Sequence, residues 1–397
     1  MSTQKKHIAI LGAGPTGLEA ALAAAERGFS FTLYEAAGTV AGNVAEWGHV
    51  RLFTPWEMVV SPRMRRALEA AGRSVPEGGE CPTGDDLIAT LYEPLAELPQ
   101  IAPHLRLAER VWDLGRQGLV KNDEIGTPER ARRPFRLLVI GEDGDRIDLA
   151  DAVLDCTGSY EHPNTLGDGG IPAPGEAAVD GEIERRIPDL ELVGEDYAGR
   201  RTLLVGGGYS AQTAARDLAE LAEEAPGTKV IWALRGEAPQ TSDPATDPLP
   251  ERARLSQAAQ ALAAGSSPAV EMRRGVVVER LKRKDGALGV ILRGRDGREE
   301  EVTVDRILAL TGSVGDHELY RQLQVHECYA TSGPMKLSAA LLGAGGGDCL
   351  AQTSHGADTL VNPEPGFFIL GAKSYGRNNT FLMRVGWEQV EEVFSLL

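Results

Sequence analysis

The chain has 397 residues, of which 42% are hydrophobic and 25% are charged, and its formal net charge is −17. These values are ordinary for a globular protein with a buried core, and the length favours two domains or one large domain with an insertion. The acidic balance argues against a broad nucleic-acid or anionic-membrane partner.

The four cysteines are far apart and form no C-x-x-C pair: Cys81, Cys156, Cys328 and Cys349. This usage suits a reducing cytosol and indicates neither a zinc site nor a disulfide framework. The histidines also lack metal-ligand spacing, so we expect no metal. The apolar stretch after Lys6 is too short for a signal peptide and no segment has the length of a membrane span, so we expect a cytoplasmic protein.

The first predicted elements form a β-α-β unit. An apolar strand, His7–Leu11, runs into the glycine-rich turn Gly12–Gly17, which opens an Ala- and Leu-rich helix over Leu18–Arg27. A second strand follows at Phe31–Tyr34. This order of strand, glycine turn and helix is typical of a dinucleotide-binding unit.

The turn has the glycine spacing that a diphosphate requires. Its first glycine permits the tight turn, its second lets the backbone approach a pyrophosphate, and its third lets helix and strand pack closely. Glu35 ends the second strand about 20 residues beyond the turn, where a carboxylate accepts hydrogen bonds from ribose hydroxyls. The cofactor-binding residues predicted here are Gly12, Gly14, Pro15, Thr16, Gly17 and Glu35.

The middle of the chain alternates strands with loops. We expect strands at Phe135–Ile140 and Arg146–Leu149, joined by a hairpin turn at Glu142–Gly144. A further strand, Ala152–Cys156, ends in Thr157-Gly158, and residues 159–200, rich in Gly, Pro and acidic groups, read as a connector.

A second β-α-β unit follows the connector. It comprises the strand Arg201–Val205, the turn Gly206–Ala211, a helix over Gln212–Glu224 and the strand Lys229–Leu234. Arg235 stands where an acid would indicate NAD, and a guanidinium there pairs naturally with the 2′-phosphate of NADP. The alternative for Arg235 is a solvated surface cation. The NADP-binding residues predicted are Gly206, Gly208, Tyr209, Ser210, Ala211 and Arg235.

The remaining elements close the chain in a similar way. In order, we expect a helix at Leu255–Ala264, a hairpin turn at Arg293–Gly297, a strand at Asp305–Leu310 ending in Thr311-Gly312, a glycine-rich loop at 343–366, a strand at Phe367–Leu370 and a final helix at Thr380–Leu396.

Several of these segments resemble the flavoproteins with two dinucleotide-binding domains, which include flavin-containing monooxygenases and thioredoxin- or glutathione-reductase-like enzymes. Asp155–Gly158 and Leu310–Gly312 are similar to the "A-T-G" strand ends of that superfamily. Trp47–Pro55 resembles the segment after the ribose-binding acid in small bacterial flavin monooxygenases. Phe367–Gly371, followed by Thr380-Phe381 and a helix, is similar to its last flavin-contacting element.

The resemblance implies an α/β fold of two Rossmann-like, doubly wound domains. An FAD-binding domain over 1–164 and 321–397 would be interrupted by an NAD(P)H-binding domain at 165–320. The cofactors implied are FAD and NADPH. The resemblance also adds further FAD-contacting candidates: Arg51, Thr157, Gly158, Gly371, Thr380 and Phe381. For Arg51, a surface ion pair is the alternative.

The chain also departs from the family. Disulfide reductases carry a cysteine pair near the flavin or in the inserted domain, but neither Ala36–Pro55 nor 165–320 contains a cysteine. The F-x-G-x-x-x-H segment of many monooxygenases is absent from the corresponding Val179–Pro188. The acid of the C-terminal "G-D" is replaced, because Ala372 and Lys373 follow the glycine.

The leading hypothesis is an NADPH-dependent flavin monooxygenase that oxygenates a small molecule at N, S or a carbonyl carbon through a C4a-(hydro)peroxyflavin. The alternative is a reductase or dehydrogenase that passes electrons to a quinone, an iron–sulfur protein or a small acceptor; a third reading is a non-enzymatic flavin-bound sensor. No catalytic residue is evident. Arg377 and Asn378 are candidates, although Asn378 or Asn379 could simply cap the last helix. A homodimer is compatible with the family.

Overall fold

The chain divides into two compact units. The computed structural model describes residues 6–344, 350 and 352–397. The first unit comprises Met1–Gly48, Thr54–His162 and Val314–Leu397, and the second comprises His49–Phe53 and Pro163–Ser313. The sequence predicts domain boundaries after residues 164 and 320, and it does not predict that His49–Phe53 groups with the second unit.

The first unit is built on a five-stranded parallel sheet with the order β18-β7-β1-β2-β3. Leu11, at the end of β1, lies opposite both Tyr34 of β2 and Asp155 of β7, and Asp155 in turn lies opposite Ile369 of β18. The carboxyl ends of four strands therefore meet at one edge of the sheet. The strands are β1 (His7–Leu11), β2 (Ser30–Tyr34), β3 (Leu105–Arg106), β7 (Ala152–Asp155) and β18 (Phe367–Ile369).

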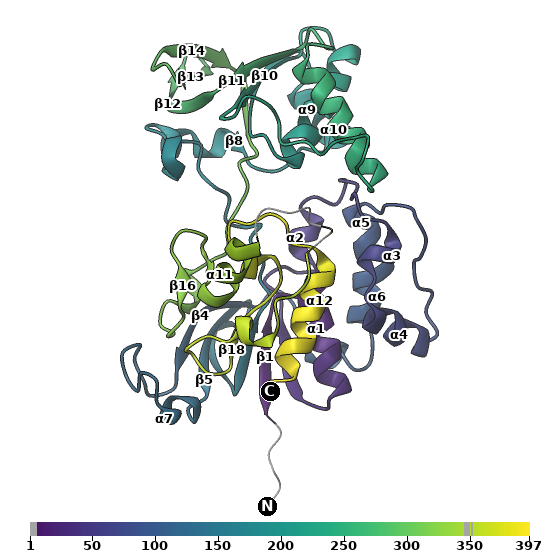
Figure 1. Cartoon of the computed structure of the whole chain (residues 1–397), viewed down its shortest axis with the longest axis vertical. Helices are drawn as coiled ribbons and strands as arrows, with labels where there is room; N and C mark the ends of the chain where they lie inside the picture. The colour runs from purple at the N-terminus through teal and green to yellow at the C-terminus, as the bar shows by residue number, and fades with distance from the viewer. Residues whose placement is uncertain (1–5, 345–349, 351) are drawn as a thin grey trace, which may run out of the picture. The chain divides into compact units, whose positions relative to one another are not determined.

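Two layers cover the faces of this sheet. On one side α1 (Pro15–Glu26) packs beside α12 (Met383–Phe394), as Figure 1 shows. On the other side the antiparallel sheet β4-β5-β6 buries a cluster that includes Phe135 and Leu137 against Phe367. Those strands are β4 (Arg110–Arg116), β5 (Phe135–Gly141) and β6 (Gly144–Ala150).

Short elements complete the first unit. The helices are α2 (Gly42–Ala45), α3 (Trp56–Val59), α4 (Pro62–Ala70), α5 (Gly84–Leu87), η1 (Ile88–Tyr92), α6 (Glu93–Ala96), η2 (Ala102–His104), α7 (Pro128–Ala131), η6 (Glu318–Tyr320), α11 (Met335–Ala344), η8 (Ala357–Leu360) and η9 (Gly371–Tyr375). A two-stranded ribbon pairs β16 (Glu327–Cys328) with β17 (Gly333–Pro334).

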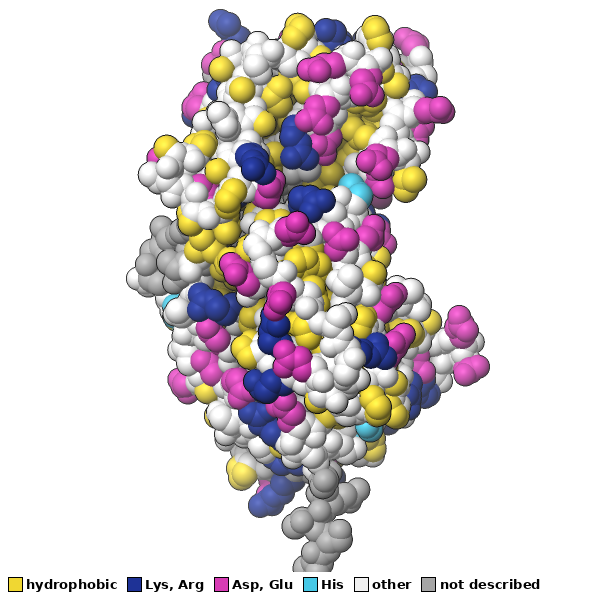
Figure 2. Space-filling view, turned by 90° about the vertical axis from the view of Figure 1, so that its right-hand side faces the viewer, with side chains coloured by type: hydrophobic (Ala, Val, Ile, Leu, Met, Phe, Trp, Pro, Cys, Tyr) yellow, Lys and Arg dark blue, Asp and Glu magenta, His cyan; other side chains and the backbone are white. Residues whose placement is uncertain are grey.

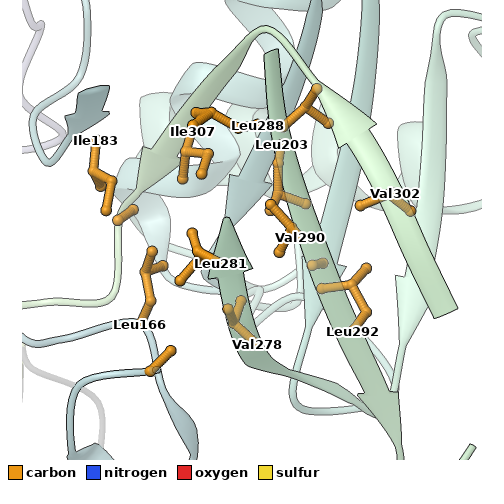
Figure 3. Close-up of a cluster of buried hydrophobic side chains, with 14 of the residues drawn as sticks. Leu166, Ile183, Leu203, Val278, Leu281, Leu288, Val290, Leu292, Val302 and Ile307 are labelled. Atoms are coloured by element: carbon orange, nitrogen blue, oxygen red, sulfur yellow. The ribbon is translucent and has the colours of Figure 1, made fainter. Parts of the chain in front are cut away.

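The second unit repeats this plan with a parallel sheet of order β11-β10-β9-β15-β8. One face buries Leu204 and Trp232 under α9 and α10, and the other packs Leu203 and Ile307 against Val290 and its neighbours in the β12-β13-β14 sheet (Figure 3). The elements are η3 (Asp168–Gly170), η4 (Glu176–Glu182), β8 (Ile183–Glu184), α8 (Leu190–Val193), η5 (Gly194–Asp196), β9 (Arg201–Val205), α9 (Tyr209–Glu224), β10 (Lys229–Leu234), α10 (Pro250–Ala263), β11 (Val270–Arg274), β12 (Val276–Lys284), β13 (Ala287–Gly294), β14 (Glu299–Val304) and β15 (Arg306–Ala309).

The predicted fold class is confirmed, with parallel sheets and helices in both units. Several helix ends differ from the prediction. α1 begins at Pro15 rather than Leu18, because proline has no N–H to lose in the first turn and its φ suits a helix. α12 spans only Met383–Phe394 of the predicted 380–396, with Leu382 rather than an asparagine at its N-cap. The loop at 343–366 falls partly outside the described residues.

A buried three-residue ion cluster ties the end of β4 and the helix α7 to the segment before β18. The Glu364 carboxylate contacts Arg116 at 2.6 Å and Arg130 at 2.9 Å, and none of the three side chains is more than 1% exposed. Gln324 donates its backbone N–H to the same carboxylate at 2.7 Å. The two guanidinium groups share this one carboxylate, and their other N–H groups donate to backbone carbonyls of Arg133, Pro365, Val120 and Asp123.

We predict that Glu364→Gln destabilises the first unit by about 3–5 kcal/mol, because it leaves two buried guanidinium groups without a counter-charge. Denaturant unfolding measures the change. Glu318→Gln is the matched control, since Glu318 pairs with Arg321 at the surface, and its effect should stay within about 0.5 kcal/mol. Equal effects of the two substitutions would contradict the prediction.

Candidate functional site

The glycine turn of the first unit is sterically required. Gly12 has a φ of +92°, and a Cβ there would lie 2.8 Å from the carbonyl oxygen of Cys156. A Cβ on Gly17 would overlap the carbonyl oxygen of Gly12. Gly14, by contrast, has no atom within 4 Å of the position a Cβ would take. Two glycines therefore let the strand turn into α1, and the third leaves open space before the helix N-terminus.

Glu35 lies at the end of β2 and is held by two backbone amides. Its Oε2 accepts a hydrogen bond from the N–H of Ala13 at 2.8 Å, and its Oε1 accepts from Ala37 at 3.0 Å. Burial raises the pKa of the Glu35 carboxyl, and the two amides oppose that shift. The carboxylate is thus fixed beside the glycine turn before any ligand binds.

A cavity of about 480 Å³ opens at this edge of the sheet. It brings together most of the FAD-binding residues that the sequence predicts: Gly12, Gly14, Pro15, Thr16, Glu35, Thr157, Gly158, Gly371 and Phe381. Gly17 instead packs inside the turn. Arg51 and Thr380 are not among the lining residues. The open space at Gly14, next to uncapped helix amides and a fixed carboxylate, suits the diphosphate and ribose of a dinucleotide.

Other residues of the cavity wall were not predicted. One set is largely apolar and comes from segments after β2 and around the start of α12: Asn43, Val44, Trp47, Met58, Val59, Leu382, Met383 and Arg384. Elsewhere, Arg110 holds Glu161 in a two-pronged ion pair with distances of 2.9 and 3.1 Å. Apart from Trp47, which begins the segment Trp47–Pro55 noted in the sequence, no local signal marks these positions, because tertiary packing brings them to the glycine turn.

Cys156 also lines the cavity, between the glycine turn and Thr157. Burial raises the pKa of its thiol well above the usual value. A thiol held neutral in this way is a poor nucleophile and a poor redox group. The described cysteines Cys81, Cys156 and Cys328 form no disulfide with one another.

The two catalytic candidates lie outside the cavity wall. Arg377 is exposed, and its Nε lies 3.3 Å from the hydroxyl of Ser332. Asn378 does not cap α12; its Oδ1 accepts hydrogen bonds from the N–H and the hydroxyl of Thr380 at 3.0 and 2.8 Å. The capping alternative is wrong, because the helix begins five residues after Asn378, at Met383.

The second unit has an equivalent turn at the end of β9. Gly206 has a φ of +140°, and a Cβ there would overlap the carbonyl oxygen of Leu310. Gly208 faces open space, Tyr209 begins α9, Ser210 is exposed, and Ala211 is fully buried. These features fit a second dinucleotide.

Arg235 lies just beyond β10 and is exposed. Within the part of the chain that the structure describes, its side chain has no hydrogen bond or ion pair. The guanidinium of Arg295 donates to its backbone carbonyl at 3.2 Å. A 2′-phosphate at the end of β10 would therefore meet a guanidinium that makes no ion pair within the described residues.

The surface and the side-chain clusters add two observations. In the ranges 6–344, 350 and 352–397, no group of three or more His, Cys, Asp or Glu side chains is arranged to hold a metal ion. None of the described helices is long and apolar enough to cross a membrane. On the face shown in Figure 2, acidic and basic side chains are interspersed.

Comparison with known proteins identifies a family for this chain. Residues 6–329 match the family model described as pyridine nucleotide-disulphide oxidoreductase. No curated protein is similar enough in sequence to count as a relative.

Solved structures share the fold at low identity. Bacillithiol disulfide reductase from Bacillus cereus is 19% identical over 99% of this chain and 98% of its own, with a TM-score of 0.69. Thioredoxin reductase from Lactococcus lactis is 16% identical over 98% of each chain, with a TM-score of 0.62. Ornithine N-hydroxylase from Kutzneria sp. 744, with reduced FAD, NADP⁺ and L-ornithine, is 14% identical over 99% and 98%, with a TM-score of 0.63.

We predict that Gly14→Ala and Gly17→Ala separate binding from folding. Gly14→Ala should change the free energy of unfolding of the ligand-free protein by no more than about 1 kcal/mol, since nothing occupies the space. It should nevertheless weaken dinucleotide binding. Gly17→Ala should destabilise the protein by about 3 kcal/mol, because its methyl overlaps backbone. Thermal unfolding and a dinucleotide titration measure both effects; a stability loss in Gly14→Ala as large as in Gly17→Ala would contradict the geometry.

Proposed function

Because the chain belongs to the pyridine nucleotide-disulphide oxidoreductase family, we propose that it is an FAD-containing, NADPH-dependent enzyme that oxygenates a small molecule. Members of this superfamily bind FAD and NAD(P)H. The observation that carries the proposal is the cavity at the carboxyl edge of the first sheet, lined by Gly12, Gly14 and Glu35. When bound, FAD supplies the hydride acceptor and the site of oxygen activation.

Residues of the cavity wall have separate tasks. The amides at the start of α1 would hold the diphosphate, and Glu35 would accept hydrogen bonds from ribose hydroxyls. Trp47, Met58 and Val59 add apolar side chains to the wall, and these would cover a flat ring system and exclude water. Water exclusion matters for oxygenation and for electron transfer alike, since a dry site protects reduced and activated species from side reactions.

The start of α12 supplies positive potential at the same cavity. Leu382, Met383 and Arg384 all line the wall, and no side chain caps the helix. The unpaired amides and the helix dipole stabilise negative charge nearby. Arg384 is restrained by Glu388 at 3.0 Å and by the carbonyl of Gln352 at 2.6 Å. This end of the cavity therefore favours a ligand that becomes more anionic during reduction.

Two observations bear on the choice between oxygenation and electron transfer. A dithiol relay is unsupported, since the described cysteines form no disulfide with one another and burial keeps the Cys156 thiol neutral. The shared fold with ornithine hydroxylases supports a monooxygenase, and the shared fold with reductases keeps electron transfer to a quinone, an iron–sulfur protein or a small acceptor as the second candidate.

The reaction of the reduced protein with oxygen separates the two candidates. The protein is reduced anaerobically with one equivalent of NADPH and then mixed with oxygen while its visible spectrum is followed. A monooxygenase should pass through a distinct absorbing species before it regains the oxidised spectrum. Direct reoxidation, together with fast reduction of a quinone or another acceptor, would favour the reductase.

We predict that Arg235 determines the preference for NADPH. Arg235→Ala should weaken NADPH binding by about tenfold or more, because a charge-assisted hydrogen bond to the 2′-phosphate is lost. Its effect on NADH should be small. Arg298→Ala is the control, since Arg298 is 90% exposed and pairs with the nearby Asp296. Titrations of the two nucleotides measure the change, and equal losses for NADPH and NADH would count against the assignment.

A further inference from the structure

A buried ion pair lies directly behind the wall of the cavity in the first unit. The Nζ of Lys373 contacts Oδ2 of Asp155 at 2.6 Å, and the two side chains are 1% and 0% exposed. The ammonium also lies 5.0 Å from the centroid of the Tyr320 ring. Gly315 leaves room for the lysine, since a Cβ there would overlap the Lys373 side chain.

The pair reaches the cavity through one residue. Oδ1 of Asp155 accepts hydrogen bonds from the backbone N–H of Thr157 at 3.2 Å and from its hydroxyl at 2.7 Å. Lys373 donates to the same hydroxyl oxygen at 3.2 Å. Thr157 itself lines the cavity. The charged pair is therefore linked to the cavity wall by the hydroxyl and the backbone N–H of Thr157.

The carboxylate belongs to the strand beside the glycine turn. Asp155 pairs in register with Leu11, the residue directly before Gly12, and Thr157, which donates to it, lines the same cavity as Gly12 and Gly14. An uncompensated carboxylate one hydrogen bond behind the wall of this cavity would repel a bound diphosphate, because a dry interior screens charge poorly. A lysine that neutralises Asp155 removes this repulsion.

We propose that Lys373 is a positioning residue of the FAD site: it cancels the charge of Asp155 and thereby lets a diphosphate bind at the turn. The inference rests on the proposed function, since it concerns the same cavity. It also accounts for a basic residue in the segment where the sequence departs from the family's acid. Lys373 contributes through Thr157 and Asp155 and does not line the cavity itself.

The network also fixes the hydrogen-bonding character of Thr157. A threonine hydroxyl has one proton to donate and two lone pairs that accept. Its proton is directed to Asp155, and one lone pair faces Lys373. The remaining lone pair can only accept, so the group of the ligand that meets Thr157 must be a donor, such as a sugar or ribityl hydroxyl.

Three variants test the proposal: Lys373→Met, Asp155→Asn and the double variant. The FAD is removed, the apoproteins are checked by thermal unfolding, and FAD affinity is measured by fluorescence quenching. Both single variants should lower the melting temperature, since each leaves one buried charge unpaired. Their affinities for FAD should change in opposite directions relative to the wild type.

Lys373→Met should weaken FAD binding by about tenfold or more, whereas Asp155→Asn should bind FAD more tightly than the wild type. The double variant should lie within about threefold of the wild type, since neither charge remains. A purely structural pair would instead weaken binding equally from either side, and that result would overturn the proposal.

Two further outcomes are decisive. If Lys373→Met does not fold, Asp155→Asn is compared with the double variant instead. Asp155→Asn should then bind FAD about fivefold more tightly than the double variant, because only Asp155→Asn keeps the lysine cation. Equal affinities there would overturn the proposal. A wild-type protein that binds no FAD would overturn the proposed function itself, which is distinguishable from wild-type binding with unresponsive variants.

Discussion

Both units depend on one steric constraint: a parallel strand passes straight into a helix through a turn that only glycine fits. A side chain at Gly12 would collide with the carbonyl of Cys156, and one at Gly206 would collide with that of Leu310. The neighbouring strand end is therefore packed against the turn in each unit. This packing brings helix amides and several strand ends to one edge, where ligands bind in open α/β sheets.

The elements that the sequence predicts well are those with local causes. The two glycine turns, the strands that flank them and the hairpin turns near Gly144 and Gly297 all follow from short-range sterics and alternation. The sequence also predicts that Glu35 lies beside the turn, because its distance from the turn follows from a fixed β-α-β unit, and Glu35 does line the cavity there. The ends of helices are less certain, since α9 already begins at Tyr209 inside the predicted turn.

What the sequence does not predict comes from tertiary packing. Trp47 and Met58 join the cavity wall although no periodicity marks them. Apart from α4, the helices between Trp56 and Ala96 have only four or five residues, which is too short for a helical period to show in the sequence. The ion pair between Asp155 and Lys373 joins residues that are 218 positions apart in the sequence. From the sequence, Lys373 is visible only as a departure from a family motif, and its buried partner gives that departure a physical meaning.

The central claim is that the first unit holds FAD and the second delivers electrons from NADPH. The most direct measurement is the visible spectrum of the purified protein under anaerobic conditions, before and after one equivalent of NADPH. The account predicts an oxidised flavin spectrum that bleaches on addition of NADPH. A colourless protein that takes up no added FAD, or a flavin spectrum unchanged by NADPH, would contradict it.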